Sequence, residues 1–378
     1  MKLLEKNNLF KGYSDLLLLG VYTDKIIAEI ARKEKDGVKI IASTEEPMED
    51  GHPRTERAEQ SRRTQWSNPR QGDEASDEAS HDGISAEKIR LNCEKAIQRL
   101  PAEQIAGVKS IAYVLGGGVA GLSFSVERVV RENRDKKISV QELSALAGEN
   151  KADSAIVEKR FLVDGFAIED PIGMEGKEIS ALVTHFNFNG NLEKALASIA
   201  ETRGMTYEGV LDARIAFIKS GLMAPKDYCA IFIFSEKTAI CVVRGEFISA
   251  VSDIEAGYGI MTEKTASAFG VGFEEGKDLL NKFRNNQIDQ SASEAIKTAL
   301  EEAAAEITDK VRAALSVIDK ENLIPGNVFV IINENFPELG KTLSGAQWLD
   351  GLPIDRNASV RIEPDAIHRA VLNYINNT

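Results

Sequence analysis

Residues 228–251 have the sequence YCAIFIFSEKTAICVVRGEFISAV, in which three apolar runs are separated by short polar turns. The runs cover 228–234, 239–243 and 246–251, and each is rich in aromatic and β-branched residues. Such short apolar runs between turn residues are typical of buried strands. The stretch is therefore predicted to form a three-stranded antiparallel meander.

The same pattern occurs near the N-terminus. Apolar runs at 16–21 and 25–30 are joined by Tyr22-Thr23-Asp24, and a third run at 38–41 follows the turn at 35–37. A second antiparallel meander is predicted there. Two meanders of the same kind imply a chain that is built from two similar halves.

The segments between and after the meanders alternate between helix and strand patterns. Between them we expect strands at 111–115, 122–126, 161–164 and 179–188, and helices at 85–100, 139–146, 192–201 and 210–220. After the second meander we expect helices at 262–268, 273–283 and 293–318, a strand at 328–332, and a last amphipathic helix over 367–375. Ser139 with Glu142, and Ser291 with Glu294, have the spacing of capping boxes. The last helix is interpreted as packing on the core, with a lipid anchor as the alternative.

Length and composition exclude several classes of protein. A chain of 378 residues is long enough for two or three domains. Its formal net charge of −13 disfavours binding to nucleic acid or to anionic lipid. The longest apolar run, 16–21, is far shorter than the roughly 20 residues that span a bilayer. A cytoplasmic protein is predicted, and we interpret Cys93, Cys229 and Cys241 as buried packing residues.

Residues 45–82 have almost no aliphatic side chains and are predicted to be a disordered insertion. A basic half is followed closely by an acidic repeat at 73–80. A solvated segment is favoured over a site for nucleic acid or lipid headgroups, because the acidic half would compete for the basic one. The basic half contains Arg54, Arg57, Arg62, Arg63, Trp66 and Arg70.

One block carries a family likeness. Residues 161–165, FLVDG, followed by 170–178, DPIGMEGKE, resemble the "vDG…DPxGMxG" block of the bacterial cell-division protein FtsA. The likeness covers most of the chain, and residues 254–262 resemble the family's "GGxxiTxDia" turn. FtsA and the related pilus protein PilM have an α/β, actin-like (ribonuclease H-like) duplicated fold with an inserted SHS2 module, and the resemblance implies that fold here.

The resemblance also implies a division into subdomains. They are 1–84 (first part of 1A), 85–160 (the SHS2-like 1C), 161–224 (return to 1A), 225–251 (first part of 2A), 252–322 (2B), and 323–378 (return to 2A with the last helix).

The family's nucleotide positions are poorly matched. The first phosphate turn falls on Gly20-Val21-Tyr22, without its aspartate, and the second falls on 232–238, where only Thr238 is kept. The "TGGG" turn falls on 333–336, and the "AExxK" pair on Lys277 and Leu280. We therefore expect no ATP or magnesium and no hydrolysis. Remnants of a nucleotide site would be Thr238, Gly257, Gly259 and Thr262.

Other motifs have structural interpretations that we favour. Gly116-Gly117-Gly118-Val119-Ala120-Gly121 fits a dinucleotide fingerprint, but a strand pattern follows it where a helix is needed. A tight turn inside the SHS2 module, away from the nucleotide cleft, is predicted. Asp164, Glu169 and Asp170 are interpreted as turn residues rather than catalytic acids, and the scattered histidines argue against a metal site.

The resemblance implies a scaffold of cell division that acts through protein surfaces. Its partner would be an FtsZ-like C-terminal tail bound through about 252–322, with possible homo-oligomers or filaments through the SHS2 module and only peripheral contact with the plasma membrane. Two alternatives keep the fold: a polymerising ATPase that uses ATP and magnesium, and a PilM-like scaffold of type IV pilus assembly. A dinucleotide-dependent enzyme ranks below them.

Overall fold

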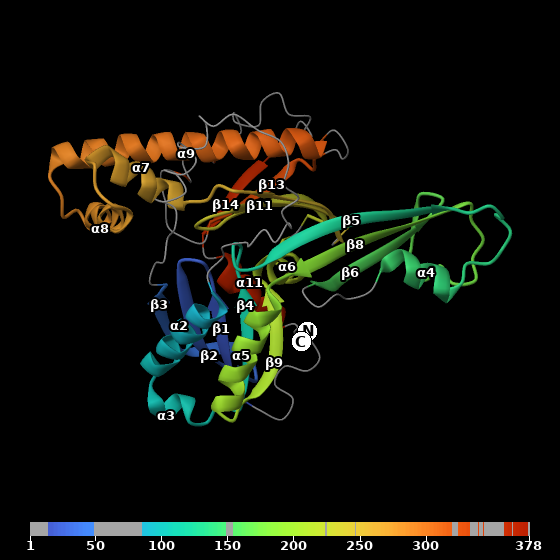
Figure 1. The fold of residues 1–378 in the computed structure, drawn as a ribbon, viewed down its shortest axis with the longest axis horizontal. Helices are drawn as coiled ribbons and strands as arrows, with labels where there is room; N and C mark the ends of the chain where they lie inside the picture. Colours follow the sequence, from blue (N-terminus) through green and yellow to red (C-terminus); the bar gives the residue numbers. More distant parts are fainter. Residues whose placement is uncertain are drawn as a thin grey trace, which may run out of the picture.

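The computed structural model describes residues 14–48, 85–148, 154–223, 225–245, 247–319, 324–332, 359–364 and 366–376, together with Leu339 and Leu343. Within these ranges three sheets and their helices form the molecule (Figure 1). The expected insertion at 45–82, apart from its first residues, and the turn at 333–336 lie outside the described residues.

The first sheet has the strand order β3-β2-β1-β4-β9. β1, β2 and β3 form the antiparallel meander, whereas β4 runs parallel to β1 and β9 parallel to β4. The strands are β1 (Asp15–Val21), β2 (Lys25–Glu34), β3 (Gly37–Pro47), β4 (Ser110–Leu115) and β9 (Thr206–Asp212).

The second sheet repeats this topology strand for strand. Its order is β12-β11-β10-β13-β14, with an antiparallel meander and two parallel strands beside β10. The strands are β10 (Asp227–Ile233), β11 (Thr238–Arg244), β12 (Phe247–Ile254), β13 (Asn327–Ile332) and β14 (Ser359–Pro364). The predicted duplication is confirmed.

Two helices join the halves. α6 (Ala213–Lys219) follows the last strand of the first sheet, α11 (Ala366–Asn376) follows that of the second, and the two pack together between the sheets (Figure 1). Phe217 of α6 meets Phe232 of β10 edge to face, with 5.3 Å between ring centroids. One hydrophobic core thus extends from the first sheet to the inner face of the second. The apolar stripe of α11 is buried in it, as predicted.

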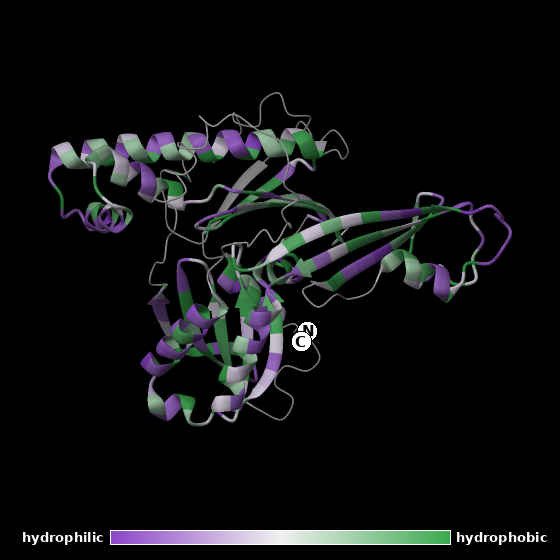
Figure 2. Ribbon diagram, in the orientation of Figure 1, coloured by the Kyte–Doolittle hydropathy of each residue, from purple (hydrophilic) through white to green (hydrophobic). Residues whose placement is uncertain are grey.

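Helices also cover the outer faces. α2 (Ala86–Arg99), α3 (Ala102–Ile105) and α5 (Gly190–Thr202) belong to the first half, where α2 and α5 pack on each other and buried Cys93 faces the core. In the second half, α9 (Gln290–Asp319) packs on β12, and α7 (Gly259–Phe269) and α8 (Phe273–Arg284) pack on α9. Apolar and polar residues alternate along α9 (Figure 2), and its apolar stripe is buried, as predicted. Cys229 and Cys241 are buried too, so all three cysteines are packing residues.

The third sheet projects from the body (Figure 1) and has the order β5-β8-β6-β7. Its elements are β5 (Gly121–Val130), α4 (Val140–Ala147), β6 (Ser154–Val163), β7 (Phe166–Ile168) and β8 (Glu178–Asn187). α4 packs on one face around a small core that includes Phe161 and Ile179. The sheet therefore spans 121–187, whereas α2 and β4, which the expected 85–160 module includes, pack in the first half.

Several sequence expectations differ from the structure. Residues 210–212 are not helical, because Val210 and Leu211 pair with β4 and the helix begins only at Ala213. The insertion cannot begin at 45, because β3 continues to Pro47. α9 begins before Ser291, where the side chain of Asp289 accepts a hydrogen bond from the Ala292 N–H at 2.8 Å. By contrast, the capping box of Ser139 and Glu142 at α4 is confirmed.

No described helix combines the length and the apolar content that a bilayer-spanning helix requires.

We predict that Phe217→Ala destabilises the protein by about 3–5 kcal/mol, because it opens a cavity where the two halves meet. Urea unfolding, followed by circular dichroism, measures the loss. Val317→Ala, at a side chain that is 65% exposed on α9, is the control and should change the free energy of unfolding by less than about 0.5 kcal/mol. Equal effects of the two substitutions would contradict the shared core.

Candidate functional site

The hairpin between β1 and β2 places an aromatic ring at the junction of the halves. Tyr22 N–H donates to the carbonyl of Lys25 at 2.9 Å and closes the turn. The Tyr22 ring lies against Gly116, at the end of β4, where an added Cβ would lie 2.2 Å from the ring. Only glycine allows this approach. Burial, with Glu29 and Asp24 nearby, raises the pKa of the Tyr22 hydroxyl.

The equivalent hairpin of the second half, between β10 and β11, also places an aromatic ring at the junction. Phe234 N–H donates to the carbonyl of Lys237 at 2.9 Å. The Phe234 ring crosses to the first half and contacts Gly117, where an added Cβ would lie 2.2 Å from the ring. On its own side it stacks on Phe232, with 6.4 Å between centroids. The two hairpin rings therefore fill adjacent positions over the glycine turn 116–118.

The N-terminus of α7 faces the second hairpin. Tyr258 N–H donates to the carbonyl of Phe234 at 2.9 Å, and Gly259 N–H donates to the carbonyl of Ser235 at 2.7 Å. An added Cβ at Gly257 would lie 2.1 Å from the Phe234 oxygen. Free N–H groups at a helix N-terminus are a seat for phosphate. Here the hairpin carbonyls already occupy these two donors.

The predicted remnants of a nucleotide site lie together at this junction. Thr238 is fully buried, and its hydroxyl donates to the carbonyl of Ala256 at 2.6 Å. Gly257 and Gly259 form the contacts with the hairpin, and Thr262 is buried one turn into α7. The structure thus brings the four residues together, and three of them hold the hairpin against α7. A role toward nucleotide stays a prediction.

A hydrogen bond closes the junction from the other side. Tyr258 Oη donates to Asp24 Oδ2 at 2.6 Å and joins the two halves across 234 residues of sequence. We call the set Tyr22, Asp24, Gly116–Gly118, Phe234 and Tyr258 the closed cleft.

The glycine turn is where sequence reasoning failed. Residues 116–118 were expected inside the inserted module, away from the cleft, but they lie within the closed cleft. As expected, the turn opens no helix: β5 follows it, and Gly118 has the positive φ of 90° that favours glycine. The dinucleotide interpretation is wrong for that reason.

A buried ion pair beside the turn was missed. Arg214, 1% exposed, donates to both carboxylate oxygens of Asp212, at 3.0 and 2.6 Å, and to the carbonyl of Ala120. Its other terminal nitrogen lies 3.5 Å from Asp253 of β12. Asp212 stands at the end of β9, near the cleft, but its oxygens are engaged by arginine and are poorly placed for a metal or base. An Asp–Arg pair two residues apart gives no sequence signal of burial.

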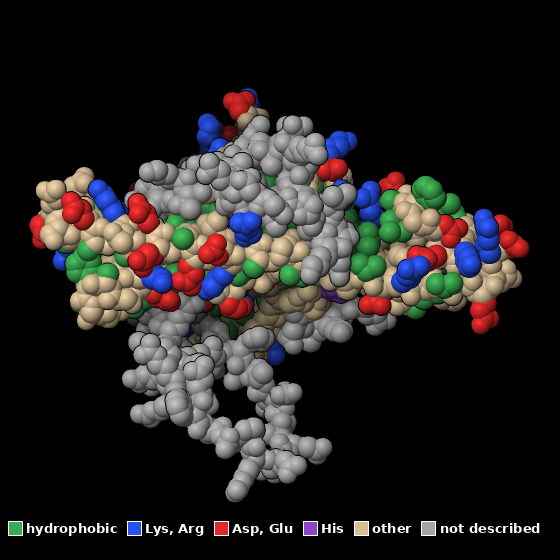
Figure 3. Space-filling model, turned by 90° about the horizontal axis from the view of Figure 1, so that it is seen from above, with side chains coloured by type: hydrophobic (Ala, Val, Ile, Leu, Met, Phe, Trp, Pro, Cys, Tyr) green, Lys and Arg blue, Asp and Glu red, His purple; other side chains and the backbone are tan. Residues whose placement is uncertain are grey.

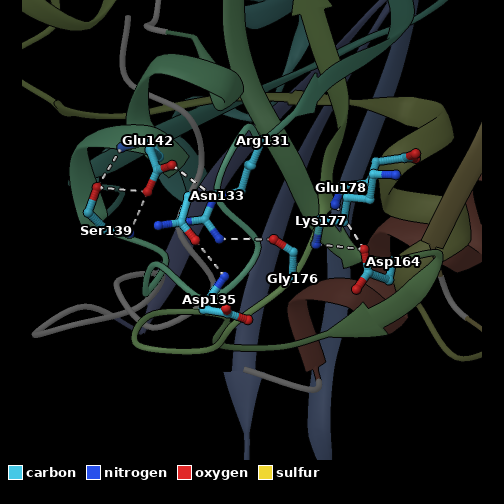
Figure 4. A network of polar contacts seen from close by, with 9 residues as sticks. All are labelled: Arg131, Asn133, Asp135, Ser139, Glu142, Asp164, Gly176, Lys177 and Glu178. Carbon is cyan, nitrogen blue, oxygen red and sulfur yellow. Dashed lines mark hydrogen bonds and ion pairs between the residues drawn. The ribbon is translucent and has the colours of Figure 1, made fainter.

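The carboxylates considered for catalysis shape a turn (Figure 4). Asp164 Oδ1 accepts the N–H groups of Lys177 and Glu178 at 2.9 and 2.8 Å, and Asp164 itself has φ 49°. Asp170 accepts from the N–H of Ile172 at 3.1 Å. Close by, Arg131 binds Glu142 and the carbonyl of Gly176. Asp164 and Asp170 thus shape turns, as the structural interpretation predicted, but the block belongs to the third sheet and not to the first half, where the expected subdomain 161–224 would put it.

Within the described ranges, no three histidine, cysteine or acidic side chains are grouped to hold a metal ion.

A cavity of about 370 Å³ lies between α11 and the first sheet, next to Tyr22. Its polar lining includes Glu29, whose Oε1 lies 3.3 Å from His368 Nδ1 and accepts from Ser43 at 3.2 Å. Lys25 and Glu45 pair at 3.4 Å in the same wall. Burial raises the pKa of Glu29, opposed by His368. Two carboxylates in this lining disfavour a triphosphate.

Solved structures resemble the chain along its whole length. The "PilM-PilN type IV pilus biogenesis complex" matches with a TM-score of 0.55 and 12% identity, over 96% of this chain and 97% of that one. Ethanolamine utilization protein EutJ from Carboxydothermus hydrogenoformans matches with a TM-score of 0.46 and 12% identity, over 95% and 89%. A Bacteroides thetaiotaomicron protein with actin-like ATPase fold and unknown function matches with 0.41 and 8%, over 97% and 98%.

No protein-family model matches the chain, and no curated protein sequence matches it. The structural likeness and the repeated sheet topology show that the chain has an actin-like fold. At 12% identity they show the fold and not a family.

We predict that Gly117→Ala destabilises the protein by about 1–3 kcal/mol, because the new methyl group overlaps the Phe234 ring. Phe234→Leu should relieve part of that cost in the double variant. Gly107→Ala is the matched control, since an added Cβ there meets nothing within 4 Å. Chemical unfolding of the wild type, the two single variants at 117 and 234, the double variant and the control measures the free energies of unfolding. A cost at 117 no larger than at 107 would refute the contact.

Titration of Glu29 gives a second prediction. A carboxyl whose pKa is raised in the folded state binds more protons when folded than when unfolded. Its contribution to stability therefore falls as the pH rises from the pKa of the unfolded state through that of the folded state. Glu29→Gln should therefore gain stability relative to the wild type between about pH 4 and 7. Thermal unfolding across that range tests it; a gain that shrinks with rising pH would contradict the burial of the charge.

Proposed function

We propose that this chain is an actin-fold scaffold that acts by binding a partner protein and neither binds nor hydrolyses nucleotide. The observation that carries the proposal is the closed cleft, where the Tyr22 and Phe234 rings contact the glycine turn directly. Catalysis on a triphosphate needs backbone donors and a cation around the phosphates. In the closed cleft the two rings lie against the turn, and the N–H groups of Tyr258 and Gly259 at the start of α7 are already bonded to hairpin carbonyls.

The charge around the cleft supports the same proposal. Glu29 and Glu45 line the neighbouring cavity, and Asp24 accepts a hydrogen bond from Tyr258. A triphosphate would meet carboxylates there, with Lys25 already paired to Glu45. Opening the cleft would also cost the Tyr258–Asp24 hydrogen bond, and bonds to charged groups contribute about 1.5–3 kcal/mol.

The partner is proposed to be a protein of pilus assembly. Support comes from the PilM–PilN complex, which has this fold and was solved with a partner protein. The DPxGMxG block weighs less for cell division than its sequence suggested, because its residues build the turns of the third sheet. A division scaffold that binds an FtsZ-like tail through 252–322 remains the second candidate, and it rests on the sequence resemblance.

Titration calorimetry with ATP and excess magnesium, together with a phosphate-release assay, tests the proposal. We expect no binding heat at millimolar nucleotide and no release above the buffer rate. Tyr258→Phe, which removes the bond between the halves, is the companion variant and should stay equally inactive, because the two rings still fill the cleft. Saturable binding by the wild type would overturn the proposal and favour the ATPase alternative.

A further inference from the structure

One long strand edge of the third sheet has no neighbouring strand in the described part of the chain. β5 is the terminal strand and pairs only with β8 among the described strands. One part of β5 lies near β12 of the second half, whereas residues 126–130 are all exposed. In Figure 1 this part of β5 extends away from the body along the upper side of the projecting sheet. No described strand pairs with the outer side of β5, and its exposed residues 126–130 are accessible to another chain.

Three valines of this edge are exposed. Val126 is 54% exposed, Val129 44% and Val130 60%. Hydrophobic side chains are visible on the projecting sheet in Figure 3. Most of the large exposed apolar side chains of the described chain lie on this sheet and its helix, namely Val126, Val129, Val130, Val140, Phe166, Ile172 and Met174. Apolar surface gathered in this way marks an interaction site.

Two features by which proteins block strand addition, a bulge and a proline, are absent from β5. The β5–β8 ladder runs without a register shift from Gly121–Asn187 to Val130–Glu178, whereas the β6–β8 ladder has one near Ile156. β5 contains no proline. Long, regular edges without bulge or proline accept a further strand, whose backbone supplies affinity and whose alternate side chains supply specificity.

The side chains on this edge define what such a strand must carry. Val126, Arg128 and Val130 share one face of the sheet, and Glu127 and Val129 share the other. Arg128 is paired with Glu178 on the next strand, and its side chain is 61% exposed. An acidic side chain beside Arg128 would extend this row of alternating charge.

We propose that residues 126–130 of β5 bind an extended segment of the partner protein as an added antiparallel strand. The segment places an acidic residue beside Arg128, apolar residues beside Val126 and Val130 on the same face, and a basic residue beside Glu127. The inference rests on the proposed function and adds the chemistry of the partner. A second copy of this chain fits less well, because antiparallel pairing of β5 that sets Val126 beside Val130 also sets Arg128 opposite itself.

Fluorescence anisotropy with labelled, end-blocked peptides tests the site. The probe Thr-Val-Val-Glu-Lys-Val-Thr should bind the wild type saturably. Arg128→Glu should weaken it at least tenfold, or about 1.4 kcal/mol. The peptide with lysine in place of glutamate should show the opposite preference and bind Arg128→Glu more tightly than the wild type. Lys297→Glu, the same charge reversal on α9, is the matched control and should leave both affinities unchanged.

Absence of probe binding to the wild type, or equal affinity for the wild type and Arg128→Glu, would overturn the site. Concentration-dependent dimerisation that Val130→Glu abolishes would assign the edge to a second copy and would also overturn it. These failures leave nucleotide binding untouched, so they are distinguishable from failure of the proposed function. Circular dichroism confirms that each variant is folded before its affinity is compared.

Discussion

Contact between two aromatic rings and a bare glycine backbone governs the junction of this molecule. Tyr22 and Phe234 arrive from equivalent hairpins of the two halves and pack on Gly116 and Gly117. Each ring can approach the backbone only because glycine has no Cβ. Each ring in turn fills the space beside its glycine, as close packing requires. The rings fill the space that a ligand would need and join the two halves. The hydrogen bond from Tyr258 to Asp24 also links the halves.

The duplicated topology explains why so few residues close the cleft. The first hairpin of each half has its turn at the junction of the halves, and α6 and α11 pack together between the two sheets. A large side chain on either turn therefore enters the same space. The third sheet lies outside this arrangement and keeps a free edge, so surfaces for partners are available without any movement of the closed cleft.

Local patterns in the sequence predicted much of the fold, and non-local packing accounts for what they missed. The meanders, α2, α9 and α11 follow from apolar periodicity, and the repeated meander implied the duplication. Val210 and Leu211 looked helical because only their pairing with β4 makes them a strand. The glycine turn could be recognised as a turn, but its position at the cleft depends on Phe234, more than a hundred residues away. Burial of Arg214 has no signal at all in the sequence.

Hydrogen–deuterium exchange of the cleft amides, with and without saturating ATP and magnesium, is the most direct measurement. The amides concerned are those of Gly116, Phe234, Tyr258 and Gly259, each bonded to a carbonyl of a hairpin. A cleft filled by side chains predicts slow exchange in both conditions and no difference between them. Fast exchange of these amides in the free protein that nucleotide slows would contradict the account.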